Sequence, residues 1–255
     1  MLYQGSERIY HLRKKYQKIL LSLLIILALI IGGGLAFLKS QAYPANQESL
    51  QQITAAKQVQ NQDQAIYFPA NPDKKRLQTV VFYNGALVDS QAYGQLALQL
   101  AQAGFDTYLL KTNLDLPILE SQAAIKLIED KHLSQVILAG HSLGGVMAAQ
   151  NSLSLKKGTV AGLLLLAAYP SHKTNLAQAQ FPVWSLVGDQ EQIIKKDAYE
   201  DGKHRLPKNT SYIKIKGGNH AGFGNYGPQK GDGQATITPK VQQEQVVKIL
   251  SQAFD

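Results

Sequence analysis

The sequence predicts an α/β fold with a mainly parallel sheet covered by helices on both faces, preceded by one transmembrane helix. Apolar runs of β type alternate with segments of helical length and spacing, which is typical of such a sheet. Two of these runs, Val136-Ile137-Leu138 and Leu163–Leu166, are apolar on both faces, as buried parallel strands are. A charge-free apolar stretch near the amino terminus adds the membrane helix. The chain of 255 residues is long enough for one ordinary domain and an appendage.

The alternation of strands and helices begins near residue 65. The expected strands are Ala65–Phe68, Thr79–Tyr83, Thr107–Leu110, Gln135–Ala139, Gly162–Ala167, Val183–Val187 and Ser211–Ile215. The expected helices are Tyr93–Ala103, Pro117–Asp130, Leu143–Leu155 and Lys240–Ala253. In open α/β sheets the ligand site lies at the carboxyl ends of the strands, so the residues that directly follow strands are candidates for function.

The apolar stretch Ile19–Leu38 contains twenty residues without a charge. As a helix it would span roughly 30 Å, the thickness of the hydrocarbon core of a bilayer. Four basic residues between Arg13 and Lys18 precede it, so the positive-inside rule places residues 1–18 in the cytoplasm and the domain outside. The alternative is a long signal peptide cleaved after Ala42, which would leave a secreted domain. The length of the apolar run favours an uncleaved, single-pass anchor in the cell membrane.

Residues 39–64 are polar and rich in Gln and Ala, which predicts a stalk, in part helical, between the anchor and a domain at 65–255. Of the formal net charge of +8, residues 1–40 carry +5, and the remainder holds 20 basic and 17 acidic side chains. This distribution argues against nucleic acid as a partner, and the membrane is expected as a partner only through the apolar helix. The chain contains no cysteine, which excludes disulfides, thiolate metal sites and a cysteine nucleophile.

The pentapeptide Gly140-His141-Ser142-Leu143-Gly144 lies between an expected strand and an expected helix. This is the G-x-S-x-G pattern in the strand–turn–helix context in which a nucleophilic serine sits on a sharp turn. The turn is so tight that the positions two before and two after the serine have no room for side chains. The pattern therefore predicts that Ser142 is a nucleophile. His141 is interpreted as a supporting neighbour rather than a base, because adjacent positions of the turn point away from each other.

A base and an acid are expected after Ser142 in the order acid, then histidine. Asp189 follows the strand Val183–Val187, and His220 follows the last expected strand. His220 would take the Ser142 proton, and Asp189 would fix the tautomer of the imidazole. The alternatives are a helix cap or turn role for Asp189 and a solvated loop position for His220. Glu191 and Asp197 are the fallback acids.

Acyl transfer also needs backbone N–H donors for the developing oxyanion. The amide of Leu143 would supply one donor. The second is expected in Asn84-Gly85-Ala86-Leu87, which follows the strand Thr79–Tyr83. Ala86 is the predicted donor and Leu87 the alternative, while an ordinary turn without this role is also consistent with the residues.

Together these residues resemble the α/β-hydrolase superfamily, and within it a lidless, dienelactone-hydrolase-like group of bacterial proteins. The resemblance covers roughly Ala65 to Phe254 and implies serine hydrolase chemistry with no metal or organic cofactor. Dienelactone hydrolases proper use a cysteine nucleophile, so their lactone substrates are not carried over to this chain. Asn84 also stands where many relatives have histidine before the glycine. The segments that carry the resemblance are Phe82–Asp89, the serine pentapeptide, Val187-Gly188-Asp189 and Gly217–Gly224.

About fifteen residues separate the strand that ends near Ala168 from the one that begins at Val183, which is too short for a helical lid. Residues 219–234 hold five glycines and would either line the substrate groove or form a mobile surface loop. The sequence thus predicts an open extracytoplasmic carboxylesterase that acts on small or envelope-derived acyl esters through an acyl-enzyme on Ser142. Acyl transfer to a cell-envelope acceptor and a non-catalytic binding module are the alternatives.

Overall fold

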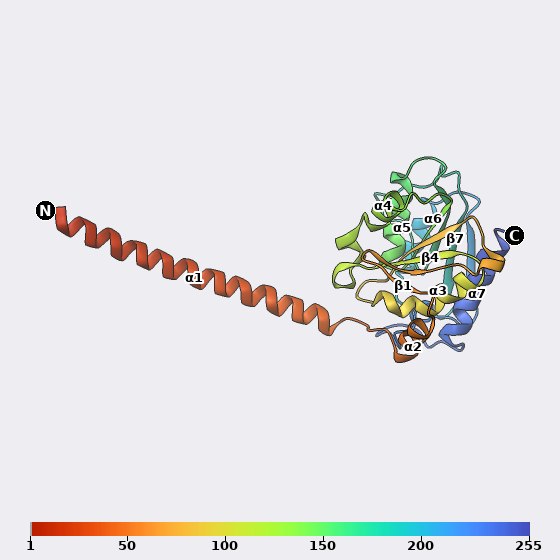
Figure 1. The fold of residues 1–255 in the computed structure, drawn as a ribbon, viewed down its shortest axis with the longest axis horizontal. Helices are drawn as coiled ribbons and strands as arrows, with labels where there is room; N and C mark the ends of the chain where they lie inside the picture. The colour runs from red at the N-terminus through yellow and green to blue at the C-terminus, as the bar shows by residue number, and fades with distance from the viewer. Residues whose placement is uncertain (1) are drawn as a thin grey trace. The chain divides into compact units, whose positions relative to one another are not determined.

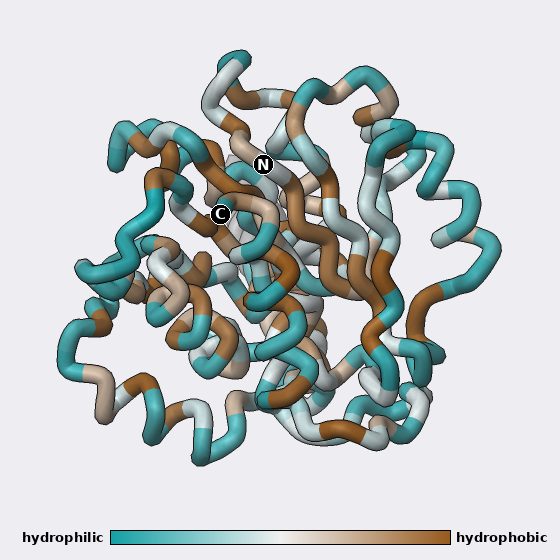
Figure 2. The backbone as a smooth tube through the Cα atoms, turned by 90° about the vertical axis from the view of Figure 1, so that its right-hand side faces the viewer, coloured by the Kyte–Doolittle hydropathy of each residue, from teal (hydrophilic) through white to brown (hydrophobic). Residues whose placement is uncertain are grey.

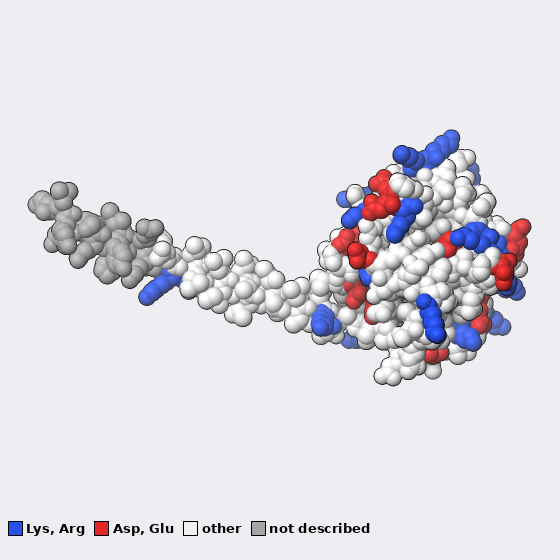
Figure 3. Space-filling model, in the orientation of Figure 1, with Lys and Arg blue, Asp and Glu red and all other residues white. Residues whose placement is uncertain are grey.

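The chain divides into two compact units, Met1–Ala42 and Tyr43–Asp255, in a computed structural model (Figure 1). The structure describes residues 2–255, with the side chains of residues 16–18 and 20–255. The first unit consists of α1 (Leu2–Ser40). Its stretch Tyr16–Ser40 is the one helix in the described part of the chain that is long and apolar enough to span a membrane. Between Lys18 and Lys39 it carries no charge (Figure 3), a composition that an anchor and a signal sequence share.

The second unit contains an eight-stranded sheet in the order β1-β2-β4-β3-β5-β6-β7-β8. The first two strands pair antiparallel, as do β2 and β4, and all other neighbours are parallel. This confirms the predicted fold class, and only the two-residue β1 was not expected. The strands are β1 (Gln60–Asn61), β2 (Ala65–Phe68), β3 (Thr79–Tyr83), β4 (Asp106–Leu110), β5 (Val136–His141), β6 (Val160–Leu166), β7 (Val183–Gly188) and β8 (Ser211–Ile215).

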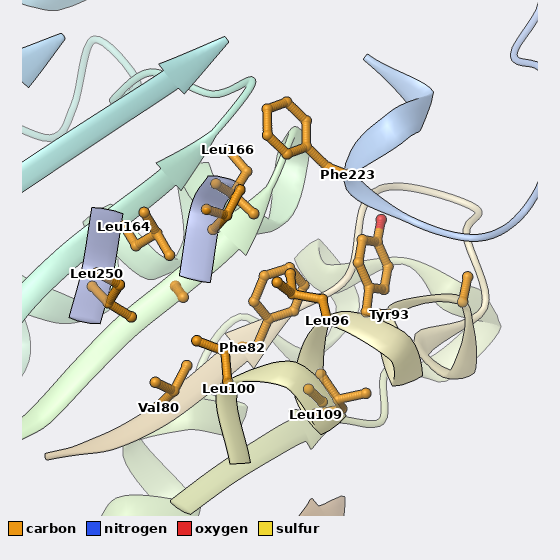
Figure 4. Packing of buried hydrophobic residues seen from close by; sticks show 14 of the residues in the cluster. Val80, Phe82, Tyr93, Leu96, Leu100, Leu109, Leu164, Leu166, Phe223 and Leu250 are labelled. Atoms are coloured by element: carbon orange, nitrogen blue, oxygen red, sulfur yellow. The ribbon is translucent and has the colours of Figure 1, made fainter. Parts of the chain in front are cut away.

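Helices cover both faces of this sheet, and each face has its own apolar core. Successive residues of β3 alternate between the two cores, since Val80 and Phe82 belong to one and Val81 and Tyr83 to the other. Figure 2 shows the apolar segments concentrated in the interior strands, and Figure 4 shows the packing around Phe82. The helices of the domain are α2 (Gln47–Ala55), α3 (Gly94–Gln102), α4 (Ala123–Asp130), α5 (Leu143–Ser154), α6 (Lys196–Lys203) and α7 (Pro239–Gln252).

The helix expected over Pro117–Asp130 is divided in the structure. A single 3-10 turn covers Pro117–Glu120, and α4 begins only at Ala123. The break has a cause in the core: the Asn151 side-chain amide donates to the Ser121 carbonyl at 2.7 Å, and the backbone N–H of Ala124 donates to Tyr83 Oη at 2.9 Å. These contacts satisfy groups at the break that a continuous helix would pair internally.

The structure corrects the prediction of a stalk over residues 39–64. The compact domain begins at Tyr43 rather than near Ala65. Tyr43 forms a parallel bridge with Val88, and α2 packs against α3. Ser49 of α2 is fully buried, and its hydroxyl donates to the Gln91 carbonyl at 2.7 Å. The polar composition gives no signal that this helix docks on the domain, because it does so through small residues and a short apolar stripe rather than through a broad apolar face.

We expect Asn46→Ala to lower the free energy of unfolding of the domain by about 1 kcal/mol, because Asn46 caps α2. Its side-chain oxygen accepts from the Ser49 N–H at 2.8 Å. The exposed neighbour Gln47 is the control, and Gln47→Ala should stay within about 0.5 kcal/mol of wild type. Denaturant unfolding followed by fluorescence of the single tryptophan, Trp184, measures both. Equal midpoints for the two variants would mean that residues 43–55 behave as a free stalk.

Candidate active site

Ser142 occupies a strained turn between β5 and α5. Its backbone angles are φ 51° and ψ −121°, a conformation that non-glycine residues seldom adopt and that clusters at functional sites. The Ser142 N–H donates to the Leu166 carbonyl at the end of β6 at 2.9 Å, and this hydrogen bond fixes the turn to the neighbouring strand. Neighbouring strands therefore define the position from which the Ser142 side chain projects.

The glycines on either side explain how so tight a turn is possible. A Cβ on Gly140 would lie 2.4 Å from the carbonyl carbon of Gly144, and a Cβ on Gly144 would lie 2.2 Å from the Asn84 carbonyl oxygen. Both distances are far below van der Waals contact with backbone that cannot move aside. The expected lack of room two residues before and after Ser142 is confirmed. The second contact also joins the serine turn to the loop that follows β3.

His220 is buried, and its Nδ1 lies 2.8 Å from Glu191 Oε2. The other Glu191 oxygen, Oε1, accepts from the backbone N–H groups of Ile193 at 2.7 Å and Ile194 at 3.0 Å. A carboxylate held in this way presents its remaining oxygen to the imidazole as an acceptor. His220 then carries its proton on Nδ1, which leaves Nε2 free to accept a proton.

The structure brings Glu191 to His220, and not Asp189. Asp189 is exposed, and its Oδ1 accepts from the Gly217 N–H at 2.8 Å, in the turn role that the sequence left open. The physical reason is that the backbone of Asp189 continues the sheet, donating to the Ile215 carbonyl at 3.0 Å, and the chain turns back only afterwards. The other fallback acid, Asp197, lies in the first turn of α6. Glu191 therefore replaces Asp189 as the candidate acid.

Ser142 and His220 line the same cleft, which has a volume of about 350 Å³. No hydrogen bond joins their side chains within the described residues, as is common before a substrate tightens such a pair. No helix lies between β6 and β7 in residues 167–182, which agrees with the expectation of a site without a helical lid. The other residues of the cleft are largely apolar: Leu143, Val146, Ala167, Ala168, Tyr169, Ile193, Ile194 and Lys195.

Two backbone amides beside the cleft remain candidates for the oxyanion. Leu143 is the first residue of α5, so its N–H has no acceptor within the helix. In the loop after β3, the Gly85 N–H donates to Tyr93 Oη at 3.0 Å and the Leu87 N–H donates to the Asp115 carbonyl at 2.7 Å. Since Val88 also donates to a backbone carbonyl, Ala86 is the one amide of the described loop 85–88 without an acceptor. The hydrogen bonds of this loop thus favour Ala86 over Leu87 as the second candidate donor to the oxyanion.

Asn84 stands where histidine is more common, and its side chain supports this loop through hydrogen bonds. Its side chain is buried, and its Nδ2 donates to the Val88 carbonyl at 2.8 Å and to the Asp115 carbonyl at 3.2 Å. Its Oδ1 accepts from the Thr112 hydroxyl at 2.9 Å. Every polar atom of the amide is used, so the loop is fixed from within.

Tyr93 is a site residue that the sequence analysis missed. Its ring is fully buried among apolar side chains, and its hydroxyl projects beyond them (Figure 4). That hydroxyl accepts from the Gly85 N–H at 3.0 Å and also forms a hydrogen bond with His141 Nδ1 at 2.8 Å. Tyr93 therefore links the loop after β3 to the serine turn. An isolated tyrosine in a helical stretch gives no signal for this role in the sequence.

His141 lies beneath His220, with their ring centroids 4.4 Å apart. Complete burial, and next the charge of the neighbouring His220, hold the pKa of His141 well below its ordinary value. His141 is therefore neutral, and a proton gained by His220 meets no like charge beneath it. The interpretation of His141 as a supporting neighbour agrees with this position.

The loop 219–234 is built into the domain over its first half. Asn219, Phe223, Asn225 and Tyr226 are all buried, and the N–H of Ala221 donates to Asp232 at 2.9 Å. This loop also lines a separate cavity of about 550 Å³, which does not include Ser142. His220 is the one residue of this loop among those that line the Ser142 cleft, so the loop does not form the wall of the groove that the sequence left open as one of its roles.

The sequence profile of the alpha/beta hydrolase family matches residues 79–244, which is more than half of the chain. The chain belongs to this family. No curated protein matches it.

Solved structures agree in fold at low sequence identity. A predicted CIB-like hydrolase from Thermoplasma acidophilum is 10% identical with a TM-score of 0.58, covering 76% of this chain and 98% of that one. An α/β hydrolase from the sediment metagenome of the Mar Chica lagoon is 14% identical with a TM-score of 0.56, covering 77% and 97%. The monoacylglycerol lipase of Paleococcus ferrophilus is 17% identical with a TM-score of 0.55, covering 74% and 98%.

The depressed pKa of His141 predicts a pH dependence of stability. Below pH about 6.5 the unfolded chain takes up a proton at His141 that the folded domain refuses, so the free energy of unfolding falls as the pH falls. Between pH 7.5 and 5.5 we expect wild type to lose about 1 kcal/mol more than His141→Gln. Denaturant unfolding at several pH values measures the difference in slope. The exposed His204→Gln is the control, and an equal slope for all three proteins would contradict the prediction.

Proposed function

We propose that this chain is a serine carboxylesterase whose domain lies outside the cytoplasm and is anchored to the cell membrane by its apolar helix. The observation that carries the proposal is the hydrogen-bonded Glu191–His220 pair, whose histidine lines the same cleft as Ser142. Such a pair has the chemistry of a general base next to a serine on a strained turn. Within the family, the serine turn and the loop residues around His220 support a place among the lidless dienelactone-hydrolase-like proteins, with serine as the nucleophile.

In the proposed reaction, His220 Nε2 takes the proton of Ser142 Oγ as the oxygen attacks the ester carbonyl carbon. The N–H groups of Leu143 and Ala86 stabilise the negative charge on the carbonyl oxygen. The proton passes to the leaving alcohol as the carbon–oxygen bond breaks, and water then hydrolyses the acyl-enzyme with His220 again as base. Glu191 keeps the imidazole in the required tautomer and stabilises its charged form. The neutral His141 beneath it adds no opposing charge.

The substrate is proposed to be an acyl ester, because one wall of the cleft is formed by aliphatic side chains such as Val146 and Ile194. One structure of the same fold is a monoacylglycerol lipase, which supports ester chemistry on this scaffold. The extracytoplasmic location is supported by the basic residues that precede the apolar helix. Cleavage after Ala42 would leave the same domain free of the membrane.

We expect the full chain in detergent to hydrolyse p-nitrophenyl butyrate and to be labelled by a fluorophosphonate at Ser142. Ser142→Ala should abolish labelling and lower the turnover number roughly 10⁴-fold or more. Ser154→Ala is the control, because Ser154 is exposed at the far end of the same helix. Mass spectrometry of the labelled peptide identifies the site. A folded protein that neither turns over the ester nor reacts at Ser142 would reject the proposed function.

The two neighbouring acids give a matched pair of variants. In Glu191→Gln the amide would donate to His220 Nδ1, which moves the imidazole proton to Nε2 and removes the base. We expect the turnover number for p-nitrophenyl butyrate to fall roughly 10²- to 10⁴-fold. Asp189→Asn keeps the oxygen that accepts from Gly217 and should stay within a few-fold of wild type. Steady-state kinetics at one pH compares them, and the opposite order would restore Asp189 as the acid.

A further inference from the structure

An exposed apolar loop stands at the carboxyl edge of the sheet, directly after β4. We refer to Asn113–Glu120 as the apolar rim. Leu114, Ile118 and Leu119 are each about half exposed, at 49%, 57% and 54%. Leu114 and the following Asp115 both have positive φ, at 55° and 54°. Exposed apolar side chains in a strained loop are unfavourable in water, which indicates a surface that is covered when the protein works.

The apolar rim is bound to the loop that carries the proposed oxyanion donor. The Asp115 carbonyl accepts from the Leu87 N–H at 2.7 Å and from Asn84 Nδ2 at 3.2 Å. The rim therefore cannot move independently of the Ala86 amide.

Leu87 also pairs with Tyr43, the residue at which the chain enters the domain after the apolar helix. The Leu87 carbonyl accepts from the Tyr43 N–H at 2.7 Å, and the Asp89 N–H donates to the Tyr43 carbonyl at 3.0 Å. Leu87 thus pairs with the rim through its N–H and with Tyr43 through its carbonyl. Tyr43 is only five residues after Leu38, where the charge-free run ends, and five residues span at most about 18 Å. A helix anchored in a bilayer would therefore keep Tyr43, which pairs with Leu87, within this chain length of the end of the apolar run.

We propose that the apolar rim contacts the bilayer that holds the apolar helix, and that Ser142 acts on acyl esters of lipids resident in that bilayer. This rests on the proposed serine hydrolase function and on retention of the helix. The acyl chain enters the cleft along its aliphatic wall. Ser142 Oγ bonds to the ester carbonyl carbon while the lipid alcohol leaves with the serine proton, and water then releases the fatty acid and restores Ser142. A bilayer is favoured over a protein partner because the short connection between Tyr43 and the apolar helix keeps the domain close to the bilayer in which that helix would lie.

The contact is tested without reference to activity. Full-length Ile118→Trp is reconstituted in phosphatidylethanolamine–phosphatidylglycerol vesicles with or without brominated acyl chains, which quench tryptophan within the bilayer. Leu77→Trp is the matched control, because Leu77 is 84% exposed and precedes β3 at the opposite edge of the sheet. The only natural tryptophan, Trp184, is buried and gives a common background. We expect quenching of Ile118→Trp well above that of Leu77→Trp, and equal quenching would overturn the contact.

The substrate class is tested by a ratio of two activities. Vesicles carrying p-nitrophenyl palmitate report on the bilayer ester, and p-nitrophenyl butyrate reports on a soluble ester. For Ile118→Ser/Leu119→Ser we expect the ratio of bilayer to soluble turnover to fall about tenfold, since apolar transfer to the bilayer is lost. Leu77→Ser/Leu153→Ser, two exposed leucines away from the site, should keep the wild-type ratio.

The outcomes separate the two proposals. Soluble turnover with an unchanged ratio in both double variants would overturn the bilayer substrate and leave the hydrolase intact. Absence of turnover on either ester in a folded protein would reject the hydrolase, while the quenching result would still decide the contact.

Discussion

The approach of α5 to the end of β3 is the contact on which the rest of the site depends. At Gly144 the backbone of the helix comes so close to the Asn84 carbonyl that a single Cβ would lie 2.2 Å from it. This contact forces the strained φ of Ser142, because the chain must reverse from strand to helix without moving away from β3. It also fixes the helix terminus and the loop after β3 as one body. The amide of Leu143 and the loop that carries the Ala86 amide are thus held in a fixed relation, which is what electrostatic preorganisation by the two proposed donors would require.

A buried polar layer extends this rigidity to the proposed base. Tyr93 joins Gly85 to His141, and His141 supports the ring of His220 from below. The two histidines have different environments although their rings are close. His141 is enclosed and its pKa is lowered by burial, whereas His220 has the Glu191 carboxylate as a partner. The geometry therefore separates a histidine that stays neutral from one whose charged form has a counter-ion, as proton transfer at a serine needs.

The sequence was sufficient for the features that depend on local pattern. Alternating apolar runs predicted seven strands of the sheet, and the glycine spacing around Ser142 follows directly from backbone clearance. Asp189 could not be separated from Glu191 in this way. Both follow β7 within three residues, and the choice depends on where the chain leaves the sheet, which is decided by the pairing of Asp189 with Ile215. The role of Tyr93 and the docking of α2 could not be predicted for the same reason, since each depends on partners distant in the sequence.

The position of Tyr43 relates the amino-terminal segment to the chemistry of the domain. Its pairing with Leu87 begins one residue after Ala42, where the signal-peptide alternative places cleavage. A domain released at that point would keep this pairing and with it the support of the loop after β3. The apolar helix is therefore not needed to form the cleft, and its contribution is one of location. Under the proposed function, a retained helix would confine the cleft to the membrane surface and raise the local concentration of bilayer esters, whereas a domain without it would face soluble substrates.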